Sequence, residues 1–260
     1  MPRTCSVSAT TWPSMARSDM LQIRNVTRKF GTKYGVLNAE LTIEPGRTYA
    51  LLGPNGSGKT TLMKMIAGLM TPTSGEILLD GVKIGPKTKA KIAYMPTESY
   101  FYNYMSIMDA GKYYRDFFED FDMTRFEEIL RRMELNPKDK IAKLSSGMNA
   151  KVRLALTLSR NAQVMMFDEP LNGVDILTRT QVINEIIRCR SEGRAMIVST
   201  HLVEEMDGHI DDVIFMKQGA VVRAGSREEL TQDKSLTDVY LEIYAPPVAA
   251  DASGEVAADA

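Results

Sequence analysis

The segment that most constrains this chain is Gly53–Thr60, which reads GPNGSGKT. The five residues before it, Thr48–Leu52, form a short and mostly apolar run that predicts a buried strand. The residues that follow, Lys59–Ala67, predict a helix that Gly68 stops. A glycine-rich turn between a strand and a helix N-terminus suits phosphate, because successive backbone N–H groups can turn inward around its oxygens.

Two side chains of this loop have expected roles in binding a nucleotide. Lys59 would reach the β- and γ-phosphates, and the Thr60 hydroxyl would be a ligand of Mg²⁺. The predicted phosphate-binding residues are Gly53, Pro54, Asn55, Gly56, Ser57, Gly58, Lys59, Thr60 and Thr61. These residues indicate a nucleotide site, but they do not say which reaction it serves.

The composition is that of a globular protein. With 260 residues, 44% of them apolar and 25% charged, the chain is long enough to bury a large core. The net charge of −1 gives no basic field, so nucleic acid is not an expected partner. Cys5 and Cys189 are isolated and predict no disulfide framework. No apolar run is long enough to cross a bilayer, so we expect a cytoplasmic protein whose membrane contact comes through a partner.

Both ends of the chain are expected to be disordered. The leader at 1–19 is rich in Ser, Thr and Pro and lacks the apolar segment of a signal peptide, and Met20 could be the true start. The tail at 246–260 offers little to bury. One ordered domain is therefore expected at 20–245.

Strand and helix patterns alternate along this domain, which predicts an α/β fold. Between Thr97 and Lys143 the pattern becomes helical, aromatic and charged, as expected of a helical insertion into the α/β core. The expected strands are Leu21–Val26, Leu41–Ile43, Thr48–Leu52, Gly75–Gly81, Ile92–Pro96, Val164–Phe167, Ala195–Thr200 and Val213–Met216, the last in a hairpin with Ala220–Val222.

Two carboxylates follow the expected strand at Val164–Phe167. Asp168 is placed to hold Mg²⁺ through water, because the carboxyl ends of such strands lie near the phosphate loop. Glu169 would point elsewhere and could act as the general base toward the attacking water. His201 follows another apolar strand and could reach the γ-phosphate, although a solvated or helix-capping histidine is the alternative for this residue alone.

The order of these motifs resembles the nucleotide-binding subunit of ABC transporters, over Leu21 to Ala245. The resemblance implies a P-loop NTPase (RecA-like) core with an antiparallel β subdomain and a helical subdomain nested at about 98–150. It implies ATP hydrolysis with Mg²⁺, in which Lys59, Glu169 and His201 are catalytic. The motifs are GPNGSGKT at Gly53–Thr60, LSSGM at Leu144–Met148, MFDEP at Met166–Pro170, Gly173–Asp175 and Thr200-His201.

In that family an LSGGQ-type signature binds the γ-phosphate held by a partner's phosphate loop. By this likeness Ser145 and Gly147 act in trans, on a second nucleotide-binding domain that is identical or different, and Asp175 lies in the loop linking the two sites. The residues agree, since Gly147 is expected to open a helix over Met148–Arg160, and a helix N-terminus favours anions. Phe30 matches the aromatic residue that stacks on adenine, with a core residue as the alternative.

Two positions depart from the family's pattern. A glutamine that senses Mg²⁺ and water is expected after Tyr94-Met95-Pro96, and this chain has Thr97 and then Glu98. Thr97 could still hydrogen-bond a metal-bound water, and Glu98 could replace the amide oxygen, but either would alter coupling. Ser146 stands at the second signature glycine, which is tolerable if its φ is negative. Neither departure removes Lys59, the acidic pair or His201, so we still expect hydrolysis. Both departures resemble variants of ABC-2-type exporter ATPases.

Aromatic residues concentrate in the inserted region. Eleven of the eighteen Tyr and Phe residues fall between Tyr94 and Phe126. Part of this cluster is expected to fill the core of the helical subdomain, but exposed aromatic residues mark interfaces. In the family this surface receives the coupling helix of a membrane subunit. We therefore expect some of Tyr100–Tyr104 to contact a transmembrane permease, which would hold the chain at the inner face of the membrane.

Two other functions share part of this motif set. A soluble ABC ATPase of an assembly or translation complex would share every motif, although tandem nucleotide domains would favour a translation factor and one set is present here. A P-loop GTPase or nucleoside kinase would need guanine- or acceptor-binding elements, and the chain has no Asn-Lys-x-Asp motif. The sequence therefore predicts the ATP-hydrolysing subunit of an ABC transporter that works as an exporter.

Overall fold

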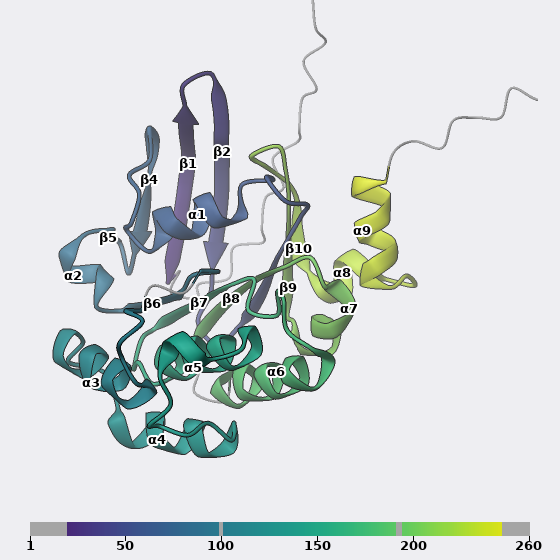
Figure 1. The fold of residues 1–260 in the computed structure, drawn as a ribbon. Helices are drawn as coiled ribbons and strands as arrows, with labels where there is room; N and C mark the ends of the chain where they lie inside the picture. Colours follow the sequence, from purple (N-terminus) through teal and green to yellow (C-terminus); the bar gives the residue numbers. More distant parts are fainter. Residues whose placement is uncertain (1–19, 99–100, 191–193, 246–260) are drawn as a thin grey trace, which may run out of the picture.

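The computed structural model describes residues 20–98, 101–190 and 194–245. The leader at 1–19, with Cys5, and the tail at 246–260 lie outside the described residues, as does Tyr100. The predicted α/β fold is confirmed, with a parallel sheet, an antiparallel sheet and a group of helices (Figure 1). None of the described helices is long and apolar enough to cross a membrane.

The larger sheet has the strand order β10-β9-β3-β8-β7-β6 and is parallel except at β10. Because neighbouring strands are parallel, their carboxyl ends meet at one edge, and β3, β6, β7 and β8 all end there. Its strands are β3 (Thr48–Leu52), β6 (Ile92–Met95), β7 (Val164–Asp168), β8 (Ala195–Thr200), β9 (Asp212–Lys217) and β10 (Ala220–Ser226).

Both faces of the central strand are buried, which explains its run of apolar residues. Ala50 and Leu52 of β3 pack into one apolar cluster, and Tyr49 and Leu51 pack into another. A strand covered on both sides has no polar face, so the alternation typical of a half-exposed strand is absent from it. The phosphate loop therefore follows a strand whose residues are all buried.

The second sheet is antiparallel, in the order β2-β1-β4-β5. Its first two strands are longer than predicted, because β1 continues to Phe30 and β2 begins at Lys33. Helix α1 packs Leu62 and Ile66 into the same apolar cluster as β1 and β2. The elements of this region are β1 (Leu21–Phe30), β2 (Lys33–Ile43), α1 (Lys59–Ile66), β4 (Ser74–Leu79), β5 (Val82–Lys83) and α2 (Pro86–Lys89).

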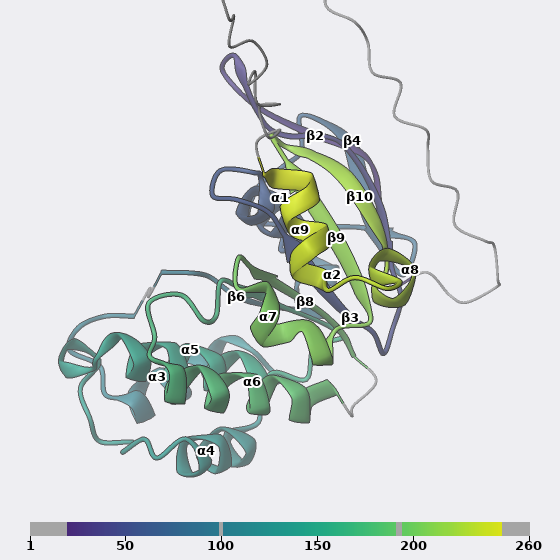
Figure 2. The same cartoon turned by 90° about the vertical axis from the view of Figure 1, so that its right-hand side faces the viewer.

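The helical insertion is confirmed, and its helices gather on the side of the parallel sheet away from the antiparallel one (Figure 2). Tyr114, Phe121 and Phe126 are buried there. The helices are α3 (Ile107–Phe117), α4 (Met123–Arg132), a 3-10 turn at Ile141–Lys143, α5 (Ser146–Leu158) and, after β7, α6 (Ile176–Arg190). Cys189, predicted to be an incidental thiol, is buried near the end of α6, and burial raises its thiol pKa.

The last helix, α9, contacts the end of the strand that precedes the phosphate loop. These elements are α7 (Val203–Met206), a 3-10 turn at Asp207–His209, α8 (Arg227–Thr231) and α9 (Leu236–Tyr244). The Tyr244 hydroxyl lies 3.2 Å from the carbonyl oxygen of Leu52 and 2.9 Å from that of Met216. Because Leu52 directly precedes Gly53, α9 braces the strand from which the loop starts.

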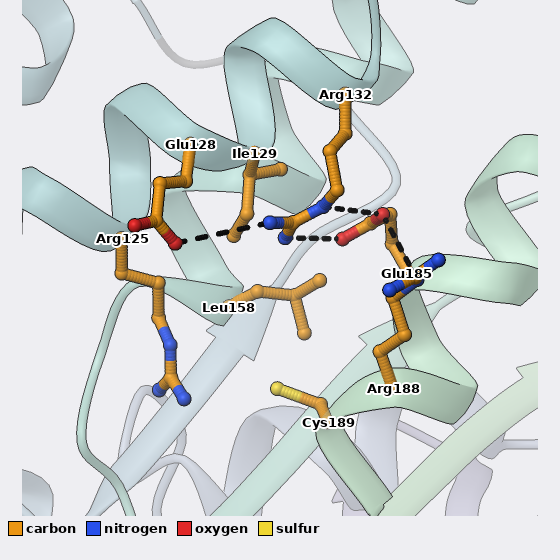
Figure 3. A pocket seen from close by; sticks show the side chains of 8 residues that line it. All are labelled: Arg125, Glu128, Ile129, Arg132, Leu158, Glu185, Arg188 and Cys189. Atoms are coloured by element: carbon orange, nitrogen blue, oxygen red, sulfur yellow. Dashed lines mark hydrogen bonds and ion pairs between the residues drawn. The ribbon is translucent and has the colours of Figure 1, made fainter.

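An ion pair ties the helical insertion to the core. The Arg132 guanidinium of α4 donates two hydrogen bonds, of 2.9 and 2.8 Å, to the carboxylate of Glu185 on α6. Figure 3 shows this fork at the edge of a hollow that also contains Arg125, Arg188 and Cys189. Glu185 is buried, and a buried carboxylate needs such a partner.

Replacing Arg132 by Met should therefore destabilise the protein. The change leaves Glu185 facing the more distant Arg188 Nε, at 3.6 Å, so we expect the free energy of unfolding to fall by about 1–3 kcal/mol. Urea denaturation measures this loss. Arg131→Met, at the exposed neighbouring position, is the matched control, and equal midpoints for the two variants would contradict the prediction.

Candidate active site

The phosphate loop lies between β3 and α1, as predicted. Its glycines are required at two positions in particular. Gly53 has φ +155° and Gly58 has φ +107°, and an added Cβ would lie 2.4 Å from the Met216 carbonyl oxygen or 2.3 Å from that of Gly35, respectively. Only glycine combines these backbone angles with such close packing. Helix α1 begins at Lys59 and ends one residue earlier than predicted, at Ile66.

A hollow of about 290 Å³ opens over this loop. The Ser57 hydroxyl is buried, and no hydrogen bond reaches it from the part of the chain that is described. An unsatisfied hydroxyl in a cradle of backbone N–H groups fits a phosphate oxygen. The lining residues are Gly35, Asn55, Gly56, Ser57, Gly58, Lys59, Thr60, Thr61, Thr97, Glu169 and Asn172.

The three residues predicted to be catalytic lie together. The Glu169 carboxylate has its Oε2 2.9 Å from His201 Nδ1 and its Oε1 3.4 Å from Lys59 Nζ. The same ammonium donates to the carbonyl oxygen of Gly53 at 2.7 Å. Oε1 is buried and makes no hydrogen bond within the described ranges. The group thus holds an acceptor oxygen at the hollow, with a cation on one side and an imidazole on the other.

The backbone turns sharply between the two predicted carboxylates. Glu169 has φ +50°, a left-handed conformation that costs a non-glycine residue of order 1–3 kcal/mol. Its backbone N–H donates to the Ser199 hydroxyl at 3.0 Å and lies 3.1 Å from the Ser199 carbonyl oxygen, which offsets part of that cost. The turn directs the Glu169 side chain toward Lys59 and His201. Asp168 is the last residue of β7, and its side chain points toward Thr60, Tyr94 and Ser199 instead.

The Asp168 carboxylate is fully buried and is held by three hydroxyls. Thr60 Oγ1 and Ser199 Oγ donate to Oδ1 at 3.1 and 2.7 Å, and the Tyr94 hydroxyl donates to Oδ2 at 3.0 Å. Burial and the charge of Asp168 raise the pKa of Tyr94, so this hydroxyl stays protonated and donates. The adjoining Thr60 and Asp168 oxygens are ligands that Mg²⁺ prefers, so these residues fit the metal.

The positions that depart from the family's pattern, Thr97-Glu98 and Ser146, lie in different parts of the structure. Thr97 lines the hollow, but its hydroxyl donates to the backbone carbonyl of Asp168 at 3.2 Å. Its predicted role at the metal site, through a hydrogen bond to a water, stays a prediction. Glu98 is exposed. Ser146 is the first residue of α5 and has a negative φ, as its replacement of a glycine requires.

Phe30 is 44% exposed, so the alternative of a core residue is wrong. Its ring lies against Gly35, where an added Cβ would be 2.6 Å from the ring carbon Cε2. The guanidinium of Arg28 lies 4.9 Å from the ring centroid. Because Gly35 lines the hollow, the ring is at its edge, and adenine stacking stays a prediction.

The signature starts a helix earlier than predicted. Helix α5 runs from Ser146 to Leu158, not from Met148 to Arg160, because Ser145 is its N-cap and accepts from the Met148 N–H at 3.2 Å. Ser145 is exposed. Gly147 packs against α6, where an added Cβ would lie 3.3 Å from the Thr178 hydroxyl.

Asp175 caps the helix that lies beside the signature. Its two carboxylate oxygens accept from the Thr178 N–H at 3.0 Å and from the Thr178 hydroxyl at 2.7 Å. These hydrogen bonds lower the pKa of Asp175, which keeps its negative charge next to the signature. Asp175 and Gly147 are therefore neighbours within one chain.

Sequence reasoning missed four residues of the site. Tyr94 and Ser199 hold Asp168, and Gly35 and Asn172 line the hollow. Ser199 could have been found by aligning the predicted strands, since it pairs with Asp168 across the parallel strands β7 and β8. No comparable signal marks Tyr94, because its hydroxyl reaches Asp168 only through the fold.

A phosphate loop after the central strand of a parallel sheet, with an acidic strand end beside its helix, defines a P-loop nucleoside triphosphatase. Residues 36–172 match the family model described as "ABC transporter". The chain belongs to this family, as an ATP-binding and ATP-hydrolysing subunit.

Relatives and solved structures agree with this family. The ABC transporter ATP-binding protein YtrB of Bacillus subtilis is 28% identical, over 82% of this chain and 74% of its own length. The lantibiotic transport ATP-binding protein SrtF of Streptococcus pyogenes is 31% identical, over 78% and 89%. The dimeric structure of a bacterial ABC transporter cassette is 25% identical, with a TM-score of 0.72 over 80% of this chain and 99% of that one. A ribose import ATP-binding protein of Escherichia coli is 29% identical, over 83% and 45%.

The Tyr94→Phe variant tests the environment of Asp168. Losing the hydroxyl removes one of three donors to the carboxylate, and such changes around a metal ligand typically weaken metal affinity 10- to 100-fold. We expect the free Mg²⁺ concentration for half-maximal ATPase activity to rise by about tenfold. Tyr49→Phe, a buried tyrosine whose hydroxyl accepts from the Glu44 N–H, is the control. Identical Mg²⁺ curves for both variants would count against the assignment.

Proposed function

We propose that this chain hydrolyses ATP in a head-to-tail dimer of nucleotide domains and thereby powers an exporter. The observation that carries the proposal is the division of its motifs between two places. Lys59, Glu169 and Thr97 line the phosphate hollow, whereas Ser145 and Gly147 are not among the described residues that line it. A second domain, identical or different, would bring its own signature to this hollow and receive this chain's signature at its own.

The geometry supports a direct hydrolysis step. Water would attack the γ-phosphorus, forming a bond to its oxygen while the bond to the bridging oxygen breaks and ADP leaves. Glu169 is the proton acceptor, and His201 orients its carboxylate from 2.9 Å. Lys59 now faces Glu169 Oε1. Binding of the γ-phosphate by Lys59 would free that oxygen to take the proton of the water.

Mg²⁺ would be held by Thr60 directly and by Asp168 through water. When bound, the ion neutralises charge on the β- and γ-phosphates. Thr97 adds a hydroxyl at the same hollow. Phe30 at the edge of the hollow would stack on the adenine ring, and Asp175 would connect this site with the signature of its own chain through Thr178.

Exposed aromatic residues support a membrane partner. Tyr102 and Tyr104 are 57% and 71% exposed, and their rings stack with centroids 5.4 Å apart. The Lys140 ammonium donates to the Tyr104 carbonyl oxygen at 2.9 Å and fixes the segment. Such an exposed, stacked aromatic pair suits a docked helix of a transmembrane permease, which would place the chain at the inner face of the cell membrane. Among the relatives, a Nod factor export protein of Cupriavidus metallidurans is in line with export, and a ribose import protein also matches.

Glu169→Gln tests the catalytic assignment. The amide cannot accept the proton of the water, so turnover should fall by about 10²- to 10⁴-fold, while ATP still binds and drives dimer formation. Phosphate release measures the first effect and size-exclusion chromatography with MgATP the second. Turnover equal to that of the wild type would remove Glu169 as the base, and a variant that stays monomeric with MgATP would rule out a dimer of two identical domains.

The double variant Tyr102→Ser, Tyr104→Ser tests the docking surface. Both side chains lie on the surface, so ATP hydrolysis by the isolated chain should stay within about twofold of wild type. Co-purification of the co-expressed wild type with its transmembrane permease should be lost in this variant. Leu69→Ser, at another exposed apolar residue, is the control. Retained co-purification by the double variant would place the permease elsewhere.

A further inference from the structure

A buried arginine connects the signature helix with the segment that follows β6. Arg153 lies on α5, eight residues after Ser145, which corresponds to about 12 Å along the helix. Its side chain crosses to the segment after β6, where Nη1 donates to the Pro96 carbonyl oxygen at 2.5 Å and to the Thr97 carbonyl oxygen. Helix α5 packs against β6 at this point.

The burial of the Arg153 guanidinium makes its hydrogen bonds to the two carbonyl oxygens important for stability. Arg153 is only 6% exposed, and a buried guanidinium is stable only where acceptors meet it. The two carbonyl acceptors belong to consecutive residues, so one guanidinium nitrogen fixes the path of the chain at Pro96-Thr97. Hydrogen bonds from a charged donor are about twice as strong as those between neutral groups.

The fixed segment in turn holds the magnesium carboxylate. Thr97 donates through its hydroxyl to the Asp168 carbonyl oxygen, and Tyr94, three residues earlier, donates to the Asp168 carboxylate. One continuous path therefore leads from Ser145 along α5 to Arg153, through Thr97, and to Asp168. The same segment leads on, beyond residue 98, to Tyr102 and Tyr104.

We propose that Arg153 is a positioning residue that couples the signature helix to the nucleotide site through the backbone of Pro96 and Thr97. Thr97 stands where the family usually has a glutamine. In this chain Arg153 would link the signature helix to the nucleotide site at that position. A shift of α5 on dimer closure would move the Thr97 carbonyl and, through the Thr97 hydroxyl, the backbone of Asp168. This inference rests on the proposed hydrolysis in a dimer.

Three variants of the full chain test the coupling. Arg153→Met removes the donors, and Arg153→Lys keeps the charge with a differently shaped donor group. For Arg153→Met we expect unchanged affinity for a fluorescent ATP analogue, a kcat reduced by about tenfold, and a Mg²⁺ curve shifted to higher concentration. In a Glu169→Gln background, dimer formation should need about tenfold more ATP. Arg153→Lys should recover part of each loss. Lys151→Met is the matched control, since Lys151 also lies on α5 but donates to the Met133 carbonyl oxygen inside the helical region.

A double-mutant cycle separates coupling from general loss of stability. Thr97→Val removes the hydrogen bond to Asp168. If Arg153 acts through Thr97, the kcat of the double variant should lie within about twofold of the lower of the two single-variant kcat values. Effects that multiply would overturn the proposed path. Equal loss of analogue affinity and kcat in both Arg153 variants, together with lower melting temperatures, would assign Arg153 a structural role only.

The wild-type protein distinguishes this inference from the function on which it rests. A wild type without Mg²⁺-dependent ATPase activity would overturn the proposed function. An active wild type whose Arg153→Met variant keeps its kcat and its ATP-driven dimer formation would falsify the role of Arg153 alone.

Discussion

The burial of the Asp168 carboxylate is the constraint on which the site depends. A carboxylate removed from water is tolerated only when donors surround it, and here α1, β6 and β8 each supply one hydroxyl. Satisfying this one group therefore fixes the phosphate-loop helix and the ends of two strands against the end of a third. Strand pairing places these strand ends side by side, and the buried carboxylate joins them to α1.

Glu169 shows how adjacent carboxylates acquire different environments. The left-handed turn at this residue separates its side chain from that of Asp168, and Ser199 holds both, through its hydroxyl to Asp168 and through contacts with the Glu169 N–H. One carboxylate is shut away among neutral hydroxyls, while the other faces an ammonium and an imidazole. The proposed metal binding and proton transfer would thereby fall to two consecutive residues in separate surroundings.

The site is also connected to the part of the protein where the signature and the exposed tyrosines lie. Helix α5 begins at the signature and contacts the β6 segment through Arg153, while Arg132 and Glu185 fasten α4 to α6. These are charged, directional contacts between helices that otherwise meet through apolar packing. They give the helical region a defined position relative to the phosphate loop, which a coupled ATPase needs.

The sequence by itself determined the phosphate loop, the acidic strand end, the signature and the α/β fold, because each is encoded in contiguous residues whose local conformation creates the chemistry. It could not place Tyr94 or Arg153, whose partners lie 74 and 57 residues away. It left Phe30 open between core and surface and began α5 at Met148, since exposure and capping depend on neighbours. The tertiary structure decided these contacts, the exposure of Phe30 and the start of α5, because strand register and helix packing bring residues that are distant in the sequence together.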